Sequence, residues 1–505
     1  MNWSSLELEQ PYNSLLKWEV KDLNSPEEGE ETPVGPISGR LFHISASDID
    51  RSEGLWLGEL VLWNGDTALA PVYVDEGGSA LFDEPMEWTA KATYMNSSYF
   101  DEIYHPRTAL EHLNNVYPYE VSHPPLGKLI ISLGILMFGM TPFGWRFMGT
   151  LFGVGMLPLL YVFLKNLVGR TSIATCGTVL LAADFMHLTQ TRLATIDTYA
   201  FFFILLMYYF MYRYLTLPAG APFRKCALPL FLSGLFWGIG AASKWTVIYG
   251  CTGLVVLYFI GLYQKLRDWP ADGETGARQP GRLKWAFQIL AFSVLVFALI
   301  PAAIYTLSYL PYAWAEGDSS LTGLVGAMWE NQKYMLSYHS GVTDTHPYSS
   351  RWYQWLFDIR PILYYMDNSV PGYTTRFAAF VNPVVCWGGL LAVLACAVQA
   401  VRRRCARALF IVIGYLAQLV PWFFIGRITF AYHYFPSVLF LILALCYVFY
   451  SLSEQEELIA WKPAMYAVTA GAAALYALFY PVLVGIQIPS WYGTCLLRWL
   501  PSWPF

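Results

Sequence analysis

The stretch WRFMGTLFGVGMLPLLYVFLKNL, residues 145–167, decides the fold class of this protein. It is strongly apolar, and its charged side chains, Arg146 and Lys165, stand near its two ends. A helix needs about 20 predominantly apolar residues to cross the hydrocarbon core of a bilayer. The stretch therefore predicts a transmembrane helix with a cation close to each membrane surface.

Similar apolar runs fill most of the remaining chain. Its 505 residues are 56% hydrophobic and 13% charged, whereas a soluble domain carries about 25% charged residues. We therefore expect an all-α polytopic membrane protein. The apolar runs predict ten transmembrane helices, at about 145–167, 172–190, 197–215, 227–243, 244–265, 285–309, 379–400, 408–426, 433–452 and 464–486.

Short basic loops orient these helices, because Lys and Arg gather in the cytoplasmic loops of membrane proteins. The basic loops carry Lys165 and Arg170; Arg213, Arg224 and Lys225; Lys265, Arg267, Arg278, Arg282 and Lys284; Arg402, Arg403, Arg404 and Arg407; and Lys462. All of them fall on one side of the membrane if the ten helices alternate. The other side, outside the cell, then receives both ends of the chain and the long loop at 310–378.

This topology divides the chain into segments. We expect a polar flexible segment at 1–40, a β-rich segment at 41–90, a catalytic loop with interfacial helices at 91–144, an N-terminal transmembrane module at 145–309, an outer loop at 310–378, a C-terminal four-helix transmembrane module at 379–486 and an outer tail at 487–505.

Two of these segments have distinctive local sequence patterns. Residues 126–140 lie between Pro125 and Pro142 and span only about 22 Å as a helix. Counting them as a crossing would break the alternation of the basic loops, so we expect a helix lying on the outer surface. Residues 55–74, LWLGELVLWNGDTALAPVYV, alternate apolar and polar side chains around Asn64-Gly65, which favours strands and a tight turn.

Several classes of function are disfavoured by composition. The sequence has no basic patch of the kind that binds nucleic acid, and its eight cysteines include no CxxC pair, so neither a disulfide framework nor a zinc site is indicated. We expect no required cofactor; a divalent metal near Asp101 and Glu102 is compatible with the sequence but is not demanded by any ligand spacing. From the polar character of the first residues we expect no signal peptide in them.

Ionisable residues recur at the outer ends of the expected helices. Such groups are rare at membrane depth and usually functional, so their recurrence at one end indicates a shared cavity at the outer interface. The candidate site residues are Asp101, Glu102, His105, His123, Lys128, Arg146, Arg192, Asp197, Lys244, His346, Arg427 and His433.

One acidic centre among several cations suits transfer chemistry on a phosphate. A carboxylate can act as general base toward a hydroxyl, while Arg and Lys can hold a leaving phosphate. The chain lacks a dinucleotide-binding fingerprint, and a lipid-linked phosphate donor would enter from the bilayer. Simpler roles remain open: a solvated acidic pair, an interfacial anchor at Arg146, a structural pair of Arg192 and Asp197, a turn lysine at 244, and packing histidines at 346 and 433.

At these residues the chain resembles the protein O-mannosyltransferases, which are lipid-carrier-dependent glycosyltransferases of the GT-C type (glycosyltransferase family 39). The resemblance covers about 95–490 and rests on an ordered set of motifs. They are YFDEIYH at 99–105, HPPLGK at 123–128, GWRFMGTLFG at 144–153, TRLATIDT at 191–198, GAASKWT at 240–246, THPYSSRWYQWLFDIRPILYY at 345–365 and YHYFP at 432–436.

The resemblance implies an activity and roles for four residues. Members transfer mannose from a polyprenyl- or dolichyl-phosphate donor to Ser or Thr hydroxyls of exported proteins, with inversion. By carry-over, Asp101 is the general base, Glu102 helps to bind the acceptor, Arg146 contacts the donor phosphate, and Lys244 is assigned to phosphate binding. The resemblance also implies a bacterial cell membrane, an extracytoplasmic active site and pairing into dimers.

Two departures from the family and two rival functions accompany this expectation. Members begin with a transmembrane helix before the acidic motif, and this sequence does not contain one, so we expect an incomplete N-terminus. The loop at 310–378 is too short for the β-trefoil of eukaryotic members. One rival function keeps the fold but uses a lipid or cell-wall acceptor, or another sugar. The other rival is a membrane transporter, which would place its charges nearer the bilayer midplane.

Overall fold

The computed structural model describes residues 95–98 and 100–505, except 271–280, 343–344 and 456–459, together with short strands and a few single residues before residue 95. The chain divides into two compact units, Met1–Arg107 and Thr108–Phe505.

The first unit contains six short strands and one short helix among its described residues. The strands pair in antiparallel fashion as β1 with β3, β2 with β4 and β5 with β6. Their bounds are β1 Asn2–Trp3, β2 Lys17–Asp22, β3 Ile37–Ser38, β4 Phe42–Ser47, β5 Leu62–Asn64 and β6 Thr67–Leu69, and the short helix is η3 Phe100–Ile103. Most of the segments expected at 1–40 and 41–90 lies outside the described residues. A further helix, α1 His105–Leu113, runs across the division between the units.

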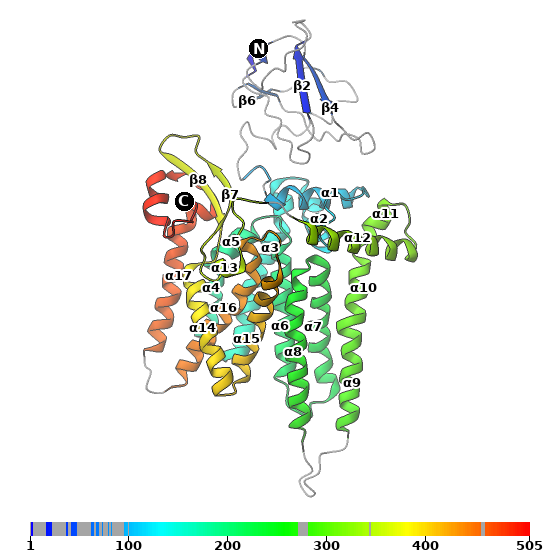
Figure 1. Cartoon of the computed structure of the whole chain (residues 1–505), viewed down its shortest axis with the longest axis vertical. Helices are drawn as coiled ribbons and strands as arrows, with labels where there is room; N and C mark the ends of the chain where they lie inside the picture. The colour runs from blue at the N-terminus through cyan, green and yellow to red at the C-terminus, as the bar shows by residue number, and fades with distance from the viewer. Residues whose placement is uncertain are drawn as a thin grey trace. The chain divides into compact units, whose positions relative to one another are not determined.

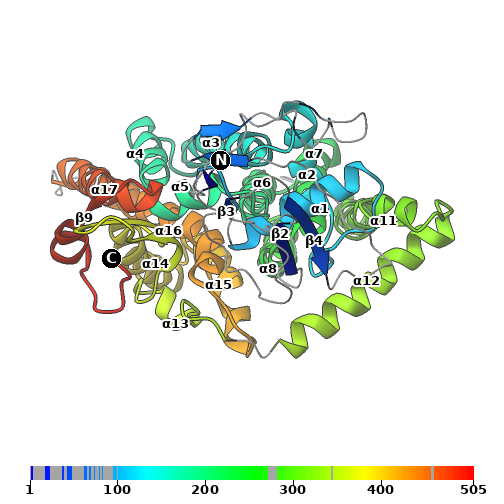
Figure 2. The same ribbon diagram turned by 90° about the horizontal axis from the view of Figure 1, so that it is seen from above.

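The second unit is a bundle of long helices. Figure 1 and Figure 2 show them side by side, and in Figure 1 α8 ends and α9 begins at the lower end while α12 lies at the upper end. The helices are α2 Leu126–Phe138, α3 Pro142–Val168, α4 Thr171–Ala182, α5 Phe185–Thr191, α6 Asp197–Leu215, α7 Phe223–Ser243, α8 Thr246–Arg267, α9 Arg282–Val294, α10 Ile300–Leu307, α11 Leu310–Ala315, α12 Leu321–Gly341, α13 Trp352–Trp355, α14 Pro383–Arg402, α15 Ala406–Leu419, α16 Phe435–Ser453 and α17 Trp461–Val484.

The expected fold class is confirmed, with a difference in the number of crossings. Among the described residues, eight helices are long and apolar enough to cross a membrane, or nine if the bent pair α4 and α5 is one span. The helix expected at 197–215 corresponds to α6, which is not among these spans and is mostly buried inside the bundle. Helix α2 is too short to be counted as a span, and its predicted place on the membrane surface stays a prediction.

The prediction of a single helix at 172–190 is wrong, because the chain bends by 57° between α4 and α5. Asp184 causes the restart. Its Oδ1 accepts a hydrogen bond from the backbone N–H of His187 at 2.9 Å and caps α5. Its Oδ2 accepts one from the N–H of Asn382 at 3.0 Å. A carboxylate that is wholly buried needs such donors, and the bend allows it to receive them.

Helix α3 shows how local signals fix a crossing. The side chain of Thr141 accepts a hydrogen bond from Gly144 N–H, and Pro142 occupies the first turn, where its missing N–H costs nothing. The helix ends at Gly169, which adopts a left-handed conformation with φ of 73°, as glycine does at helix C-termini. The quoted sequence stretch therefore lies within one helix.

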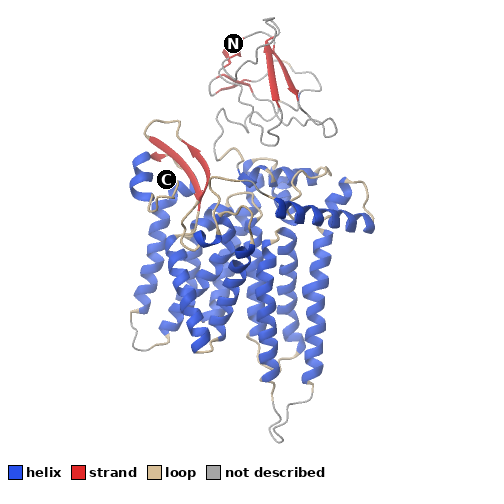
Figure 3. Cartoon of the chain, in the orientation of Figure 1, coloured by secondary structure: helices blue, strands red, loops and turns tan. Residues whose placement is uncertain are grey.

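The outer loop expected at 310–378 contains more regular structure than the sequence predicted. Helices α11, α12 and α13 lie in it, and strands β7 Ile362–Asp367 and β8 Tyr373–Ala379 form an antiparallel hairpin (Figure 3). Strand β9 Ile488–Pro489 pairs with β8. An apolar cluster that includes Phe380, Phe479 and Trp503 packs beneath this sheet, which joins the C-terminal tail to the bundle.

Candidate functional site

The acidic pair occupies a short helix of the first unit. Asp101 and Glu102 lie in the first turn of η3, where Glu102 is fully buried and Asp101 is partly exposed. His105 begins α1 and is also buried. Anions are favoured at helix N-termini. The remaining predicted residues belong to the second unit.

Gly127 brings three of the sequence motifs together in the second unit. A Cβ atom placed on it would meet Cγ2 of Ile196 at 2.7 Å and the carbonyl oxygen of Ser243 at 3.1 Å. The start of α2 is therefore pressed against the start of α6 and the end of α7. Ile196 precedes Asp197 and Ser243 precedes Lys244, so HPPLGK, TRLATIDT and GAASKWT meet at one point.

Lys128 is clamped by the segment that precedes it. Its Nζ donates to Oε2 of Glu120 at 2.6 Å, to the carbonyl oxygen of Glu120 at 2.7 Å and to that of His123 at 3.1 Å. The side chain is fully buried. An ammonium group has three protons to donate, and all three are used here. Lys128 therefore holds the 120–123 segment in place and has no donor left for a phosphate.

The other oxygen of Glu120 organises the same segment. Oε1 accepts hydrogen bonds from the N–H of Ser122 at 2.8 Å and from its hydroxyl. It also lies 3.0 Å from Nδ1 of His123. A buried carboxylate is costly unless it is paired and hydrogen-bonded, and Glu120 meets both conditions.

Lys244 forms a second buried ion pair. Its Nζ donates to Oδ2 of Asp197 at 2.7 Å, and both side chains are almost fully buried. The same ammonium lies 5.4 Å from the centre of the Tyr432 ring, within reach of a cation–π contact. The pairing expected as one alternative, Arg192 with Asp197, is wrong, because Asp197 bonds Lys244 instead. Because the bond to Asp197 uses one of the three ammonium protons, Lys244 has further protons to donate.

A series of ring contacts links the segments that carry the two ion pairs. Trp245, next to Lys244, lies 6.0 Å from the ring of His339, which lies 5.6 Å from the ring of His123. His339 Nε2 is 2.9 Å from the carbonyl oxygen of Ser122. Burial, followed by electrostatic effects of His123 and Arg427, lowers the pKa of His339 to about 4. The ring is therefore neutral near pH 7.

Arg427 lines an open cavity of about 630 Å³ together with Arg351 and Arg360. The cavity lies between two segments that are bonded to each other. Ser350 N–H donates to the carbonyl oxygen of Thr429 at 2.8 Å, and the Thr429 hydroxyl donates to the carbonyl oxygen of Ser350 at 2.6 Å. None of the described residues that line this cavity is acidic, so it can accept an anion.

The two remaining predicted histidines contact the same segment. His346 lies 5.1 Å from the ring of Phe430, and burial lowers its pKa. His433 is buried, with its ring stacked on Tyr432 at 4.4 Å and edge-on to Trp422 at 4.5 Å. Both rings make aromatic contacts, as the packing role that the sequence left open for them would require.

The two remaining predicted arginines lie on α3 and at the end of α5. Arg146 lies in the first part of α3 and is partly buried. Arg192 ends α5, and its Nη1 is buried without a hydrogen-bond partner among the described residues. The tight contact of Gly153 with Thr191 fixes α3 against this turn. Among the described residues, no group of three or more His, Cys, Asp or Glu could hold a metal ion.

Sequence reasoning missed Glu120 and Tyr432 as members of the site. Glu120 lies three residues before His123 and eight before Lys128, so the charge in the segment YPYEVSHPPLGK was a signal. Tyr432 was part of a quoted motif, but nothing in its spacing pointed to Lys244.

Two family profiles match the chain. Residues 88–315 match the profile described as dolichyl-phosphate-mannose-protein mannosyltransferase. Residues 324–503 match the C-terminal four-transmembrane region of protein O-mannosyltransferase. The two matched ranges together cover most of the chain.

The chain belongs to the protein O-mannosyltransferase family. As a member of this family, it is a membrane glycosyltransferase, as the sequence motifs indicated. The matched ranges include every predicted site residue.

Curated relatives agree with this assignment. A polyprenol-phosphate-mannose–protein mannosyltransferase of Mycobacterium tuberculosis is 27% identical over 459 residues, which are 80% of this chain and 86% of the relative. A protein of the same name from Corynebacterium glutamicum is 24% identical over 480 residues, covering 84% of this chain and 88% of the relative.

A solved structure shares the fold. The S. cerevisiae protein O-mannosyltransferase Pmt1-Pmt2 complex bound to the sugar donor superimposes with a TM-score of 0.70 at 13% identity. The match covers 82% of this chain and 90% of the yeast chain. The predicted GT-C type of fold is thereby confirmed.

Proposed function

We propose that this chain transfers mannose from a polyprenyl-phosphate-linked donor to Ser or Thr hydroxyls of exported proteins, with inversion, at the outer face of a bacterial cell membrane. The observation that carries the proposal is the meeting of HPPLGK, TRLATIDT and GAASKWT at Gly127, beside the Lys244–Asp197 pair. The names of the curated mycobacterial and corynebacterial relatives support the donor and the acceptor.

The proposed step is a single displacement. The acceptor hydroxyl oxygen attacks the anomeric carbon as the bond from that carbon to the phosphate oxygen breaks. Asp101 takes the hydroxyl proton as general base, and Glu102 helps to bind the acceptor. The bonding electrons leave with the lipid phosphate, whose growing charge Arg146 and Lys244 stabilise.

The contacts of Lys244 support its role in this step. Its ammonium group donates one hydrogen bond to Asp197, and its remaining protons can bind a phosphate oxygen. The basic cavity at Arg351, Arg360 and Arg427 adds positive charge nearby, as the effect of Arg427 on His339 indicates. With cations supplying this charge, we propose that transfer requires no metal or other cofactor, which activity retained in a chelator would test.

Transfer from a radiolabelled polyprenyl-phosphate mannose to a Ser/Thr peptide tests the proposal in membranes that contain the full chain. We expect Asp101→Asn to slow transfer by roughly 100-fold or more, the usual size of a general-base contribution. Glu330→Gln, which removes an exposed carboxylate on α12, is the matched control and should remain active. Full activity of Asp101→Asn would refute the assignment of the base.

The reaction products test the proposed inversion and the proposed acceptor. NMR of the mannosylated peptide should show the anomeric configuration opposite to that of the donor, and retention would contradict a single displacement. A parallel reaction with lipid and cell-wall acceptors should leave the label on the peptide. The yeast relative forms a complex; we propose that this chain also pairs with a second copy, which its mass in detergent would test.

Membrane orientation can be tested with single cysteines in a Cys495→Ser background. Ser369, at the exposed turn between β7 and β8, and Arg404, in a basic loop, lie in segments that the topology assigns to opposite sides. A membrane-impermeant maleimide should label Ser369→Cys in intact cells and Arg404→Cys only after lysis. The reverse pattern would place the proposed site on the cytoplasmic side.

A further inference from the structure

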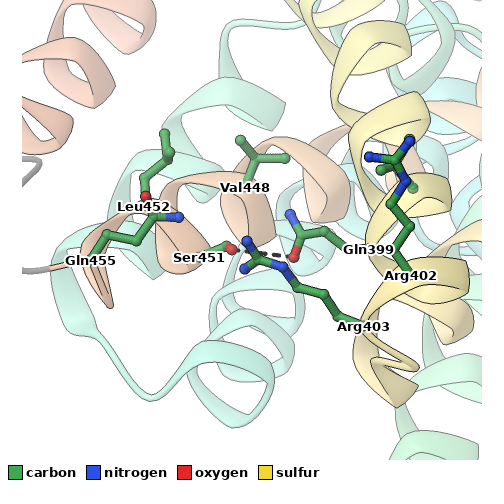
Figure 4. A pocket seen from close by; sticks show the side chains of 8 residues that line it. Gln399, Arg402, Arg403, Val448, Ser451, Leu452 and Gln455 are labelled. Carbon is green, nitrogen blue, oxygen red and sulfur yellow. Dashed lines mark hydrogen bonds between the residues drawn. The ribbon is translucent and has the colours of Figure 1, made fainter.

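A second cavity, of about 210 Å³, lies between the ends of α14 and α16, next to a basic loop and away from the site described above. Figure 4 shows the guanidinium group of Arg403 beside the side chains of Gln399 and Ser451. The Ser451 hydroxyl donates to Oε1 of Gln399 at 3.2 Å. This bond orients the amide and leaves both of its N–H groups to donate to a ligand.

The charge of this cavity is positive. Arg402 and Arg403 both line it, and none of its described lining residues is acidic. Glu454, next to the lining residue Gln455, is paired with Arg170 at 2.6 Å. Glu456 and Glu457 lie outside the described residues. Two guanidinium groups, together with the N–H groups of the Gln399 amide, match the oxygen atoms of a phosphate group.

The other wall of the cavity is apolar. Val398, Val448 and Leu452 line it. Val398 also belongs to a row of exposed side chains on α14, in which Leu391 is 68% exposed, Leu394 57%, Val398 52% and Val401 79%. Residues three or four apart lie on the same side of a helix, so this row runs along the span and reaches the arginines at its end. A free phosphate would make no use of it, whereas an acyl chain would.

We propose that this cavity binds the phosphate headgroup of an anionic phospholipid in the leaflet that faces the basic loops. The phosphate lies between Arg402 and Arg403, with Gln399 as a further donor, and the acyl chains follow the apolar row on α14. Basic residues next to a membrane span attract anionic lipids. The cavity adds defined donors to this general attraction, and the site is independent of the proposed mannosyl transfer.

Thermal unfolding of the purified full-length chain in detergent tests this site, because a ligand that binds the native state raises the midpoint of unfolding. The probes are phosphatidylglycerol, phosphatidylcholine and inorganic phosphate, each titrated separately. We expect phosphatidylglycerol to stabilise the protein and the other two to have little effect. Equal stabilisation by inorganic phosphate would indicate a free-anion site and overturn the lipid assignment.

Matched charge variants distinguish lipid binding in the cavity from a general attraction of anionic lipid to the basic loop. Arg403→Gln should weaken the apparent affinity for phosphatidylglycerol about tenfold, as expected for loss of one charge-assisted contact. Arg404→Gln removes the same charge from the same exposed loop but does not line the cavity, and it should change the affinity much less. Equal effects of the two variants would overturn the proposal.

A third variant keeps the test decisive if Arg403→Gln fails to fold. Val448→Phe fills the cavity without changing any charge. It should abolish the stabilisation by phosphatidylglycerol while leaving transfer activity near that of the parent protein. Stabilisation of Val448→Phe equal to that of the parent would show that the lipid binds elsewhere.

Discussion

Lys244 Nζ lies 2.7 Å from Oδ2 of Asp197, and the two side chains are each only 6% exposed. The pair joins the residue after α7 to the first residue of α6. Because neither charge has access to much water, each depends on the other for its stability. The pair therefore serves both the fold and the proposed chemistry, and variants can separate the two roles.

Lys244→Met and Asp197→Asn should each destabilise the protein by about 3–5 kcal/mol, because each leaves a buried charge without its partner. The double variant should recover much of this loss. Unfolding in detergent and mannosyl transfer are measured on all three proteins. If Lys244 holds the leaving phosphate, the double variant folds but stays slow; a stable and fully active double variant would remove Lys244 from the mechanism.

Lys128→Met should strongly lower the free energy of unfolding. It leaves the Glu120 carboxylate and the carbonyl oxygens of Glu120 and His123 without their shared donor, at a cost of about 3–5 kcal/mol. Lys333→Met is the control, since Lys333 pairs with Glu330 in an exposed position, where such pairs contribute about 0–1 kcal/mol. Similar unfolding midpoints for the two variants would contradict the clamp.

Gly127→Ala should lower transfer activity more than it lowers stability. The added methyl would push α2 away from Ile196 and Ser243 and so displace the residues next to Asp197 and Lys244. Gly326→Ala is the control, because nothing lies within 4 Å of its Cβ position and alanine favours a helix by up to about 1 kcal/mol. Transfer at the parent rate by Gly127→Ala would show that the tight contact is not needed.

His339 should make stability fall in mild acid. Its pKa is lowered to about 4 in the folded chain and is near 6.5 in the unfolded chain. Between these values the unfolded chain binds a proton that the folded chain does not, so the free energy of unfolding decreases as pH falls from about 6.5 to 4. His339→Asn, measured at pH 7 and pH 5, should lose less stability than the parent; an equal loss would assign the effect to other groups.

The positions of the crossings were predictable because apolarity and helix length are local properties. The expected helix at 197–215 coincides with α6. The break at Ala183 and Asp184 was not predicted, although an aspartate before a helical run is an N-cap signal. The sheet of β7, β8 and β9 was also missed. Its pairing of β8 with β9 joins segments more than 100 residues apart, which local patterns do not reveal.

Sequence alone determined the membrane class, most of the helices, the ordered motifs of the family and the candidate charges. Only the tertiary structure decided how those charges are used: Lys128 is saturated by Glu120 and His123, Lys244 is paired with Asp197, and His346 and His433 pack against aromatic rings. The physical reason is that hydropathy acts along the chain, whereas an ion pair depends on which helix ends meet. Here the close approach that Gly127 allows decides which ends those are.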